Sequence, residues 1–258
     1  MYKVLIMLLV VLFAAQSAEA QTVKTASTQA IIKDSKAISE IKTDENKNED
    51  VIDWRKITVK QVEDLLKEEK IKLDEYDYLG NTPLMTAAAE CAKPEILETL
   101  IKNGKDVKLY PPTDNPEAAL ATSALYASAG CHMDIVKMLV EKGASVNVYG
   151  EMGMSLLMHY SARTHDPKII EYLIEKGANV LDLDDNGNHV LMYALLNEET
   201  AHKVIEVLLK NGADINMMGI TSGGQTFTVL DFAEQRNLDE DAIKYLLEIG
   251  AKHASELY

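Results

Sequence analysis

One stretch, residues 77–88, constrains the fold of this chain more than any other part of it. It joins a turn signal, Asp-x-x-Gly, directly to Thr-Pro-Leu and then to small alanines. Gly80 can take the positive φ of a tight turn, and Thr82 can cap a helix that begins at the following proline. An apolar stripe at 96–101 follows, and Gly104 ends it. The stretch therefore predicts a turn, a helix, a short loop and a second helix that ends at a glycine.

The same unit recurs along the chain, and its helix-ending glycines lie 34 to 39 residues apart. Apolar pairs at helical spacing precede each glycine, and alanine follows most of them. The glycines are Gly104, Gly143, Gly177, Gly212 and Gly250. This unit resembles the ankyrin repeat, whose signature Thr-Pro-Leu-His-x-Ala returns about every 33 residues. The resemblance implies an all-α solenoid of about five stacked repeats behind an N-terminal half-repeat cap, with hairpin-like fingers between the repeats.

The resemblance sets the expected boundaries of the cap and repeats, and the residue patterns of the N-terminal region set those of the segments before them. The boundaries are 1–20 for a signal peptide, 21–52 for a flexible linker, 53–80 for the cap helix and first finger, and 81–258 for repeats at 81–113, 121–152, 154–186, 188–221 and 227–258. Two fingers are expected to be extended, before Thr122 and before Thr228. Insertions in repeat arrays often mark the binding face, although loops also accept extra residues at little cost.

The first 20 residues have the features of a secretory signal peptide. Lys3 precedes an apolar run at 4–15, and Ala-Glu-Ala ends at Ala20, so we expect cleavage that leaves Gln21 as the first residue. The short basic region and the cleavage site are typical of bacterial export, and the chain resembles bacterial periplasmic ankyrin-repeat proteins. We expect a periplasmic location, with full secretion as the alternative.

The segment that follows is polar and then gives way to a helix cap. Residues 21–52 are rich in Lys, Ser, Asp and Glu and predict a flexible tether, with folding on a partner as the alternative. Thr58 and Gln61 form a capping-box pattern before an apolar stripe, and Trp54 is expected to pack on this cap helix.

The net charge of −15 argues against nucleic acid and anionic membranes as partners. The resemblance instead implies a protein partner for a monomeric module, bound at positions that flank the turns and the ends of the first helices. Tyr and Met at such positions favour interfaces, although these side chains could also pack only on neighbouring fingers. The expected binding residues are Tyr76, Tyr78, Leu79, Asn81, Tyr110, Tyr149, Glu151, Met152, Met154, Arg163, Leu183, Asp185, Asn186, Met217 and Met218. The same comparison with the family also places Asn188 at a position that flanks a turn and Arg236 near the end of a first helix.

The sequence offers little support for catalysis. Its six histidines are scattered, and HExxH, Cys-x-x-Cys, Gly-x-Ser-x-Gly and phosphate-loop motifs do not occur. Residues 184–188 carry the carboxylates of a calcium-type loop but lack its closing glutamate, so we interpret them as a turn. We therefore expect no enzyme activity, cofactor or metal. The alternative is a metal-dependent enzyme that uses His159 and His165.

The two cysteines, Cys91 and Cys131, each follow a Thr-like position by nine residues, so we expect them at the same place in neighbouring repeats. Exported chains usually pair their cysteines. Packed helices lie roughly 8–10 Å apart, however, whereas a disulfide needs Cα atoms within about 7 Å. One extra residue near Ala92 could let the two meet; otherwise they are two small apolar side chains that stay apart.

Deletion of residues 21–48 should leave the Tm of the repeat domain nearly unchanged, because this polar segment buries little apolar surface. Thermal unfolding followed by circular dichroism measures the effect. A large fall in Tm would show instead that the segment docks on the repeats.

Overall fold

The computed structural model describes residues 52–77, 80–104, 115–197 and 199–257. The predicted signal peptide with its cleavage site, the linker up to residue 51, and Tyr78, Leu79 and Tyr110 lie outside the described residues. The cap helix is α3 (Val59–Lys67). Five helix pairs follow: α4 (Pro83–Ala89) with α5 (Pro94–Asn103), α6 (Pro116–Ala127) with α7 (Met133–Glu141), α8 (Leu156–Ser161) with α9 (Pro167–Glu175), α10 (Val190–Ala194) with α11 (Ala201–Lys210), and α12 (Val229–Gln235) with α13 (Glu240–Glu248).

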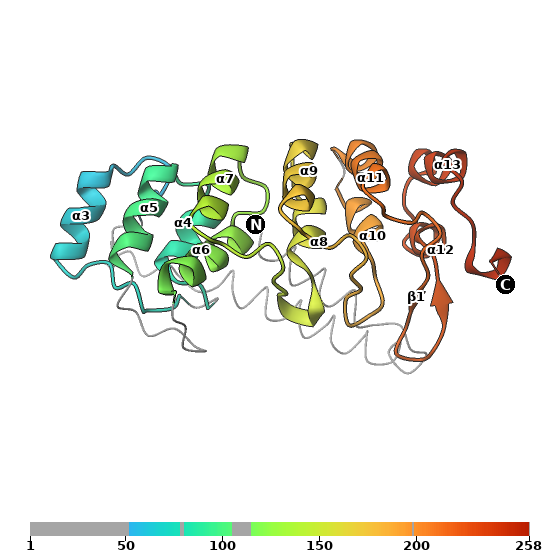
Figure 1. Ribbon diagram of the computed structural model, residues 1–258, viewed down its shortest axis with the longest axis horizontal. Helices are drawn as coiled ribbons and strands as arrows, with labels where there is room; N and C mark the ends of the chain where they lie inside the picture. The colour runs from blue at the N-terminus through green and yellow to red at the C-terminus, as the bar shows by residue number, and fades with distance from the viewer. Residues whose placement is uncertain (1–51, 78–79, 105–114, 198, 258) are drawn as a thin grey trace, which may run out of the picture. The chain divides into compact units, whose positions relative to one another are not determined.

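The helix pairs lie side by side in chain order (Figure 1). The first helices of neighbouring pairs pack on one another, as α4 does on α6 and α10 on both α8 and α12. The second helices form a parallel row, in which α5, α7, α9 and α11 contact their neighbours. We call the first helix of each pair the inner helix and the second the outer helix. This arrangement confirms the predicted all-α stack of helix–turn–helix repeats.

Local capping defines where the inner helices begin. Thr82, Ser155 and Thr228 each accept a hydrogen bond from a backbone N–H three residues later. Thr58 and Gln61 form the predicted capping box at the start of α3, and Trp54 is buried. The short elements lie between pairs or at the end: η1 (Glu151–Gly153), β1 (Gly219–Ile220), β2 (Thr226–Phe227) and η2 (Ala254–Glu256). No helix among the residues described is both long enough and apolar enough to cross a membrane.

The start of the second repeat differs from the prediction. Helix α6 begins at Pro116 with Asn115 as its cap, so Thr122, before which the extended finger was expected to end, lies inside the helix. The Thr122 hydroxyl donates to the carbonyl of Ala118 and accepts from the N–H of Ser145. The predicted repeat start at 121 is therefore wrong for this helix. Some of the extra residues expected in the finger before Thr122 belong to the helix instead. Asn115 supplies its cap and Pro116 is a favourable first residue, so the helix begins ahead of Thr122.

Cys91 and Cys131 form a disulfide, with their Cα atoms 5.4 Å apart. Their predicted equivalence is wrong, since Cys131 directly precedes the α7 cap His132, whereas Ala92 holds that place before the α5 cap Lys93. Cys91 instead has a φ of 56°, a conformation that glycine adopts at the same place in the next repeat. The prediction was wrong because it aligned the two repeats on Thr82 and Thr122, and this alignment is one residue out at the loop that carries the cysteines. The spacing of about 8–10 Å that is expected for equivalent positions on packed helices therefore does not apply to these two residues.

Replacement of both cysteines by alanine should destabilise the domain by roughly 3–4 kcal/mol in the chain-entropy model, because the bond closes a loop across a sequence separation of 40. Urea unfolding of the native and double-alanine proteins measures the difference. Reductant should destabilise the native protein similarly and leave the variant unaffected. Two thiols that react with a labelling reagent in the folded, unreduced protein would contradict the pairing.

Candidate functional site

Most of the strongly exposed large hydrophobic side chains that the structure describes lie on the fingers. We define a finger as the connection from an outer helix, or from α3, to the next inner helix. Six large hydrophobic side chains are strongly exposed among the described residues, and five of them lie on fingers. Those five are Tyr76, Tyr149, Leu181, Leu183 and Ile220, with exposed fractions from 41% to 67%. The sixth, Leu247, lies on the outer helix α13. Among the described residues, strongly exposed large hydrophobic side chains are therefore concentrated on the fingers before α4, α8, α10 and α12.

Neighbouring fingers are held against one another by their backbones. The N–H of Asp185 donates to the carbonyl of Met152 at 2.9 Å, which joins the fingers before α8 and α10. In the next finger, β1 and β2 form an antiparallel pair that places Gly219 opposite Phe227. A Cβ at Gly187 would overlap the backbone of Ile220, so the fingers before α10 and α12 also touch closely. These three fingers form one continuous surface.

A buried carboxylate fixes the shape of the finger before α10. Asp184 accepts hydrogen bonds from the N–H groups of Asn186 and Asn188, both at 2.8 Å, and from the Asn188 side chain at 2.9 Å. The hydroxyl of Tyr193 on α10 donates to the same carboxylate at 2.7 Å. Burial first, and then the negative charge of Asp184, raise the pKa of Tyr193, so its hydroxyl keeps its proton. The segment interpreted as a turn is a turn, and this network ties it to the inner helix.

Aromatic and histidine rings on the inner helices contact one another or nearby arginine side chains. Tyr126 of α6 stacks on His159 of α8 with ring centroids 4.5 Å apart, and His159 Nδ1 lies 3.2 Å from the guanidinium of Arg163. Burial, with the positive charge of Arg163 as the second cause, lowers the pKa of His159 to about 3, so this ring is neutral near pH 7. In the last repeat Arg236 lies over the ring of Phe232 at 5.0 Å.

The predicted binding residues differ in their accessibility. Tyr76, Glu151, Tyr149, Leu183 and Asp185 are exposed. The remaining described ones are half-buried: Asn81, Met152, Met154, Arg163, Asn186, Met217 and Met218. Asn188 is buried in the Asp184 network and does not present its side chain to a partner.

Sequence reasoning missed Ile220 and Leu181. Ile220 lies in the extended finger, where the extra residues move it away from the positions that correspond to Tyr149 and Leu183. The signal that could have revealed it is the short alternating pattern around the Gly-Gly turn that forms β1 and β2. Leu181 stands two residues before Leu183 and is 53% exposed.

The two histidines proposed for a metal-dependent enzyme have separate partners. His159 is held by Tyr126 and Arg163, whereas the exposed His165 pairs through Nδ1 with Glu199 at 2.7 Å. Within the part of the chain that the structure describes, no group of three or more His, Cys, Asp or Glu side chains is placed to hold a metal ion.

Comparison with protein families identifies the repeats. A model of the ankyrin repeat matches residues 79–110, and a model of three consecutive ankyrin repeats matches residues 124–219. A search of curated proteins found no match. The chain therefore contains ankyrin repeats, and its fold is an all-α ankyrin-repeat solenoid. Arrays of such repeats generally serve as protein-interaction modules rather than as enzymes, because stacking gives them an extended surface for a partner.

Two tyrosine–aspartate contacts allow a matched test of the finger before α10. Tyr193→Phe should lower the free energy of unfolding by about 1.5–3 kcal/mol, since it removes a buried hydrogen bond to a carboxylate. Tyr149→Phe removes the exposed contact with Asp182 and should have almost no effect. Urea unfolding measures both variants. Equal effects of the two substitutions would show that the buried network does not hold the finger.

Proposed function

We propose that this chain is a non-catalytic module that is exported to the periplasm and binds a protein partner through its fingers and inner-helix surface. One observation carries the proposal: five of the six strongly exposed large hydrophobic side chains that the structure describes lie on the fingers, and only Leu247 lies on an outer helix. A contiguous apolar surface that a monomer leaves exposed usually marks an interaction site.

The chemistry of the finger surface supports a protein as the partner. Tyrosine is a frequent hot-spot residue in protein interfaces, and apolar side chains form the interface core that a polar rim surrounds. Here Tyr149 and Leu183 are such side chains, and the exposed carboxylates of Glu151 and Asp185 lie on the same two fingers. A partner with apolar side chains beside basic ones would match this surface.

The rigidity of the fingers supports binding as well. Backbone contacts join the three fingers before α8, α10 and α12, and the Asp184 network shapes the middle one. A surface that is already ordered loses little conformational entropy when a partner binds. This favours recognition by a preformed face.

The proposal includes the absence of enzyme activity. The alternative function is that of a metal-dependent enzyme that uses His159 and His165. His159 is neutral near pH 7 and engaged with Arg163, which suits packing better than proton transfer. A hydrolytic activity that disappears on metal removal and in a His159→Gln variant would favour the enzyme instead.

A triple substitution of Tyr76, Tyr149 and Leu183 by alanine tests the binding surface. Native and triple-variant proteins are immobilised and exposed to periplasmic extract, and bound proteins are quantified by mass spectrometry. We expect capture of the specific partner to fall at least about tenfold, because hot-spot side chains each contribute about 1–2 kcal/mol or more. Helical circular dichroism should stay unchanged.

Leu247→Ala provides the matched control, since Leu247 is equally exposed but lies on the outer helix α13. It should capture the partner as the native protein does. Equal capture by the native protein and the triple variant would overturn the finger surface as the binding site. Cell fractionation addresses the location, since protein found in the culture supernatant rather than the periplasm would favour an exported effector.

A further inference from the structure

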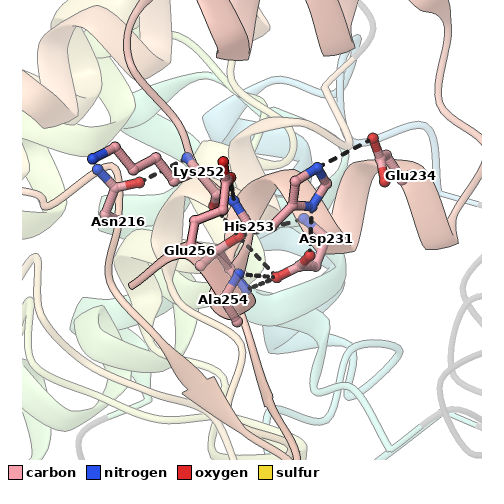
Figure 2. A network of polar contacts seen from close by, with 8 residues as sticks. Asn216, Asp231, Glu234, Lys252, His253, Ala254 and Glu256 are labelled. Atoms are coloured by element: carbon pink, nitrogen blue, oxygen red, sulfur yellow. Dashed lines mark hydrogen bonds and ion pairs between the residues drawn. The ribbon is translucent and has the colours of Figure 1, made fainter. Parts of the chain in front are cut away.

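The C-terminal tail, residues 251–257, folds back onto the start of α12. Figure 2 shows His253 between Asp231 and Glu234, both of which come from α12. His253 Nδ1 lies 2.8 Å from Asp231 Oδ1, and its Nε2 lies 3.7 Å from Glu234 Oε1. We call these three residues, together with Ala254, the C-terminal latch.

Asp231 connects the tail to the cap of α12. Its Oδ2 accepts from the N–H of Thr228 at 2.9 Å, and its own N–H donates to the Thr228 hydroxyl at 3.4 Å, which completes the capping box of the helix. The same Oδ2 accepts from the N–H of Ala254 at 2.9 Å. One carboxylate therefore both caps the helix and holds the tail.

The tail also holds the finger before α12. The N–H of Lys252 donates to the Asn216 side chain at 2.9 Å, and the Asn216 amide donates to the carbonyl of Gly250 at 3.2 Å. The hydroxyl of Thr228 donates to the carbonyl of Lys252 at 2.7 Å. Any loosening of the tail thus reaches the loop that leads into β1.

The charged groups that face His253 are predominantly negative. Asp231 and Glu234 approach from α12, and the side chain of Glu256 in η2 accepts from the backbone N–H of His253 at 2.8 Å. Lys252 is the adjoining cation in the chain, and it is exposed. The ionised imidazolium is thus stabilised by its surroundings, in contrast to His159 and His189, whose pKa values burial lowers to about 3 and about 4.

We propose that the tail is a pH-dependent latch: the protonated His253 side chain holds residues 252–257 on the start of α12, and loss of this proton loosens them. The latch does not depend on whether the finger surface binds a protein. It requires only that the contacts of His253 with Asp231 and Glu234 are stronger when the ring is charged.

The direction in which the stability of the latch changes with pH follows from the pKa shifts of His253 and Asp231. The hydrogen bond to Asp231, opposed by partial burial, raises the pKa of His253, with added contributions from Glu234 and Glu256. Burial raises the pKa of Asp231, but hydrogen bonds from Ala254, Thr228 and His253 outweigh it, so the net pKa is lowered. The contribution of His253 is complete below about pH 6.5 and is lost as the pH rises through its raised pKa in the folded chain. The contribution of Asp231 is lost only in acid, below about pH 4.

Proton NMR and amide hydrogen exchange of the purified chain test the latch. The His253 ring should titrate at a higher pH than an ordinary histidine, and protection of the Ala254 amide should fall several-fold from about pH 5 to about pH 8. The pH midpoint of the fall in Ala254 protection should coincide with the titration midpoint of the His253 ring. The factor by which protection falls should equal ten raised to the difference between the pKa of His253 in the docked tail and its pKa in the released tail. The Leu173 amide in α9 serves as the internal reference for global stability.

His253→Gln should make Ala254 protection independent of pH over this range. His165→Gln is the matched control, because His165 forms an exposed pair with Glu199 away from the tail and its loss should leave the Ala254 profile unchanged. An ordinary or lowered His253 pKa, or a native Ala254 profile that does not change with pH, would overturn the latch. A pH-dependent fall that persists in His253→Gln would overturn it as well.

Discussion

Packing between neighbouring helix pairs is the interaction on which the rest of this structure depends. A pair of short helices cannot bury its own apolar side chains. The clearest case is α10, in which all five residues from Val190 to Ala194 are buried. Such a helix is stable only between α8 and α12, both of which it contacts. Each repeat is thus stabilised by its neighbours, and the fingers are positioned by this stack.

A stack of this kind has two ends that must be closed, and the chain closes them differently. At the start, α3 contacts α5, and the Thr58–Gln61 capping box with the buried Trp54 completes the cap. At the far end, Asp231 caps α12 and binds the returning tail. The disulfide adds a covalent link between the first two repeats, near the first of these ends.

Much of the fold could be predicted from local residue patterns. Thr82 starts the first inner helix as predicted, and Ser155 and Thr228 cap their helices in the same way, because capping depends on residues three positions apart in the chain. The start of α6 was predicted wrongly, because the family pattern pointed to Thr122 while the local Asn115–Pro116 signal decided the outcome. That single error also misplaced the two cysteines relative to one another.

The sequence by itself determined the repeat, its helix caps and the positions of exposed finger residues such as Tyr76 and Tyr149, since all of these follow from short-range spacing. Only the tertiary structure decided which side chains become engaged or buried. Asn188 is taken up by the Asp184 network, and His253 meets Asp231 across 22 positions of the chain. The physical reason is that burial and charge depend on contacts between separate repeats and on the path of the tail, which no local pattern encodes.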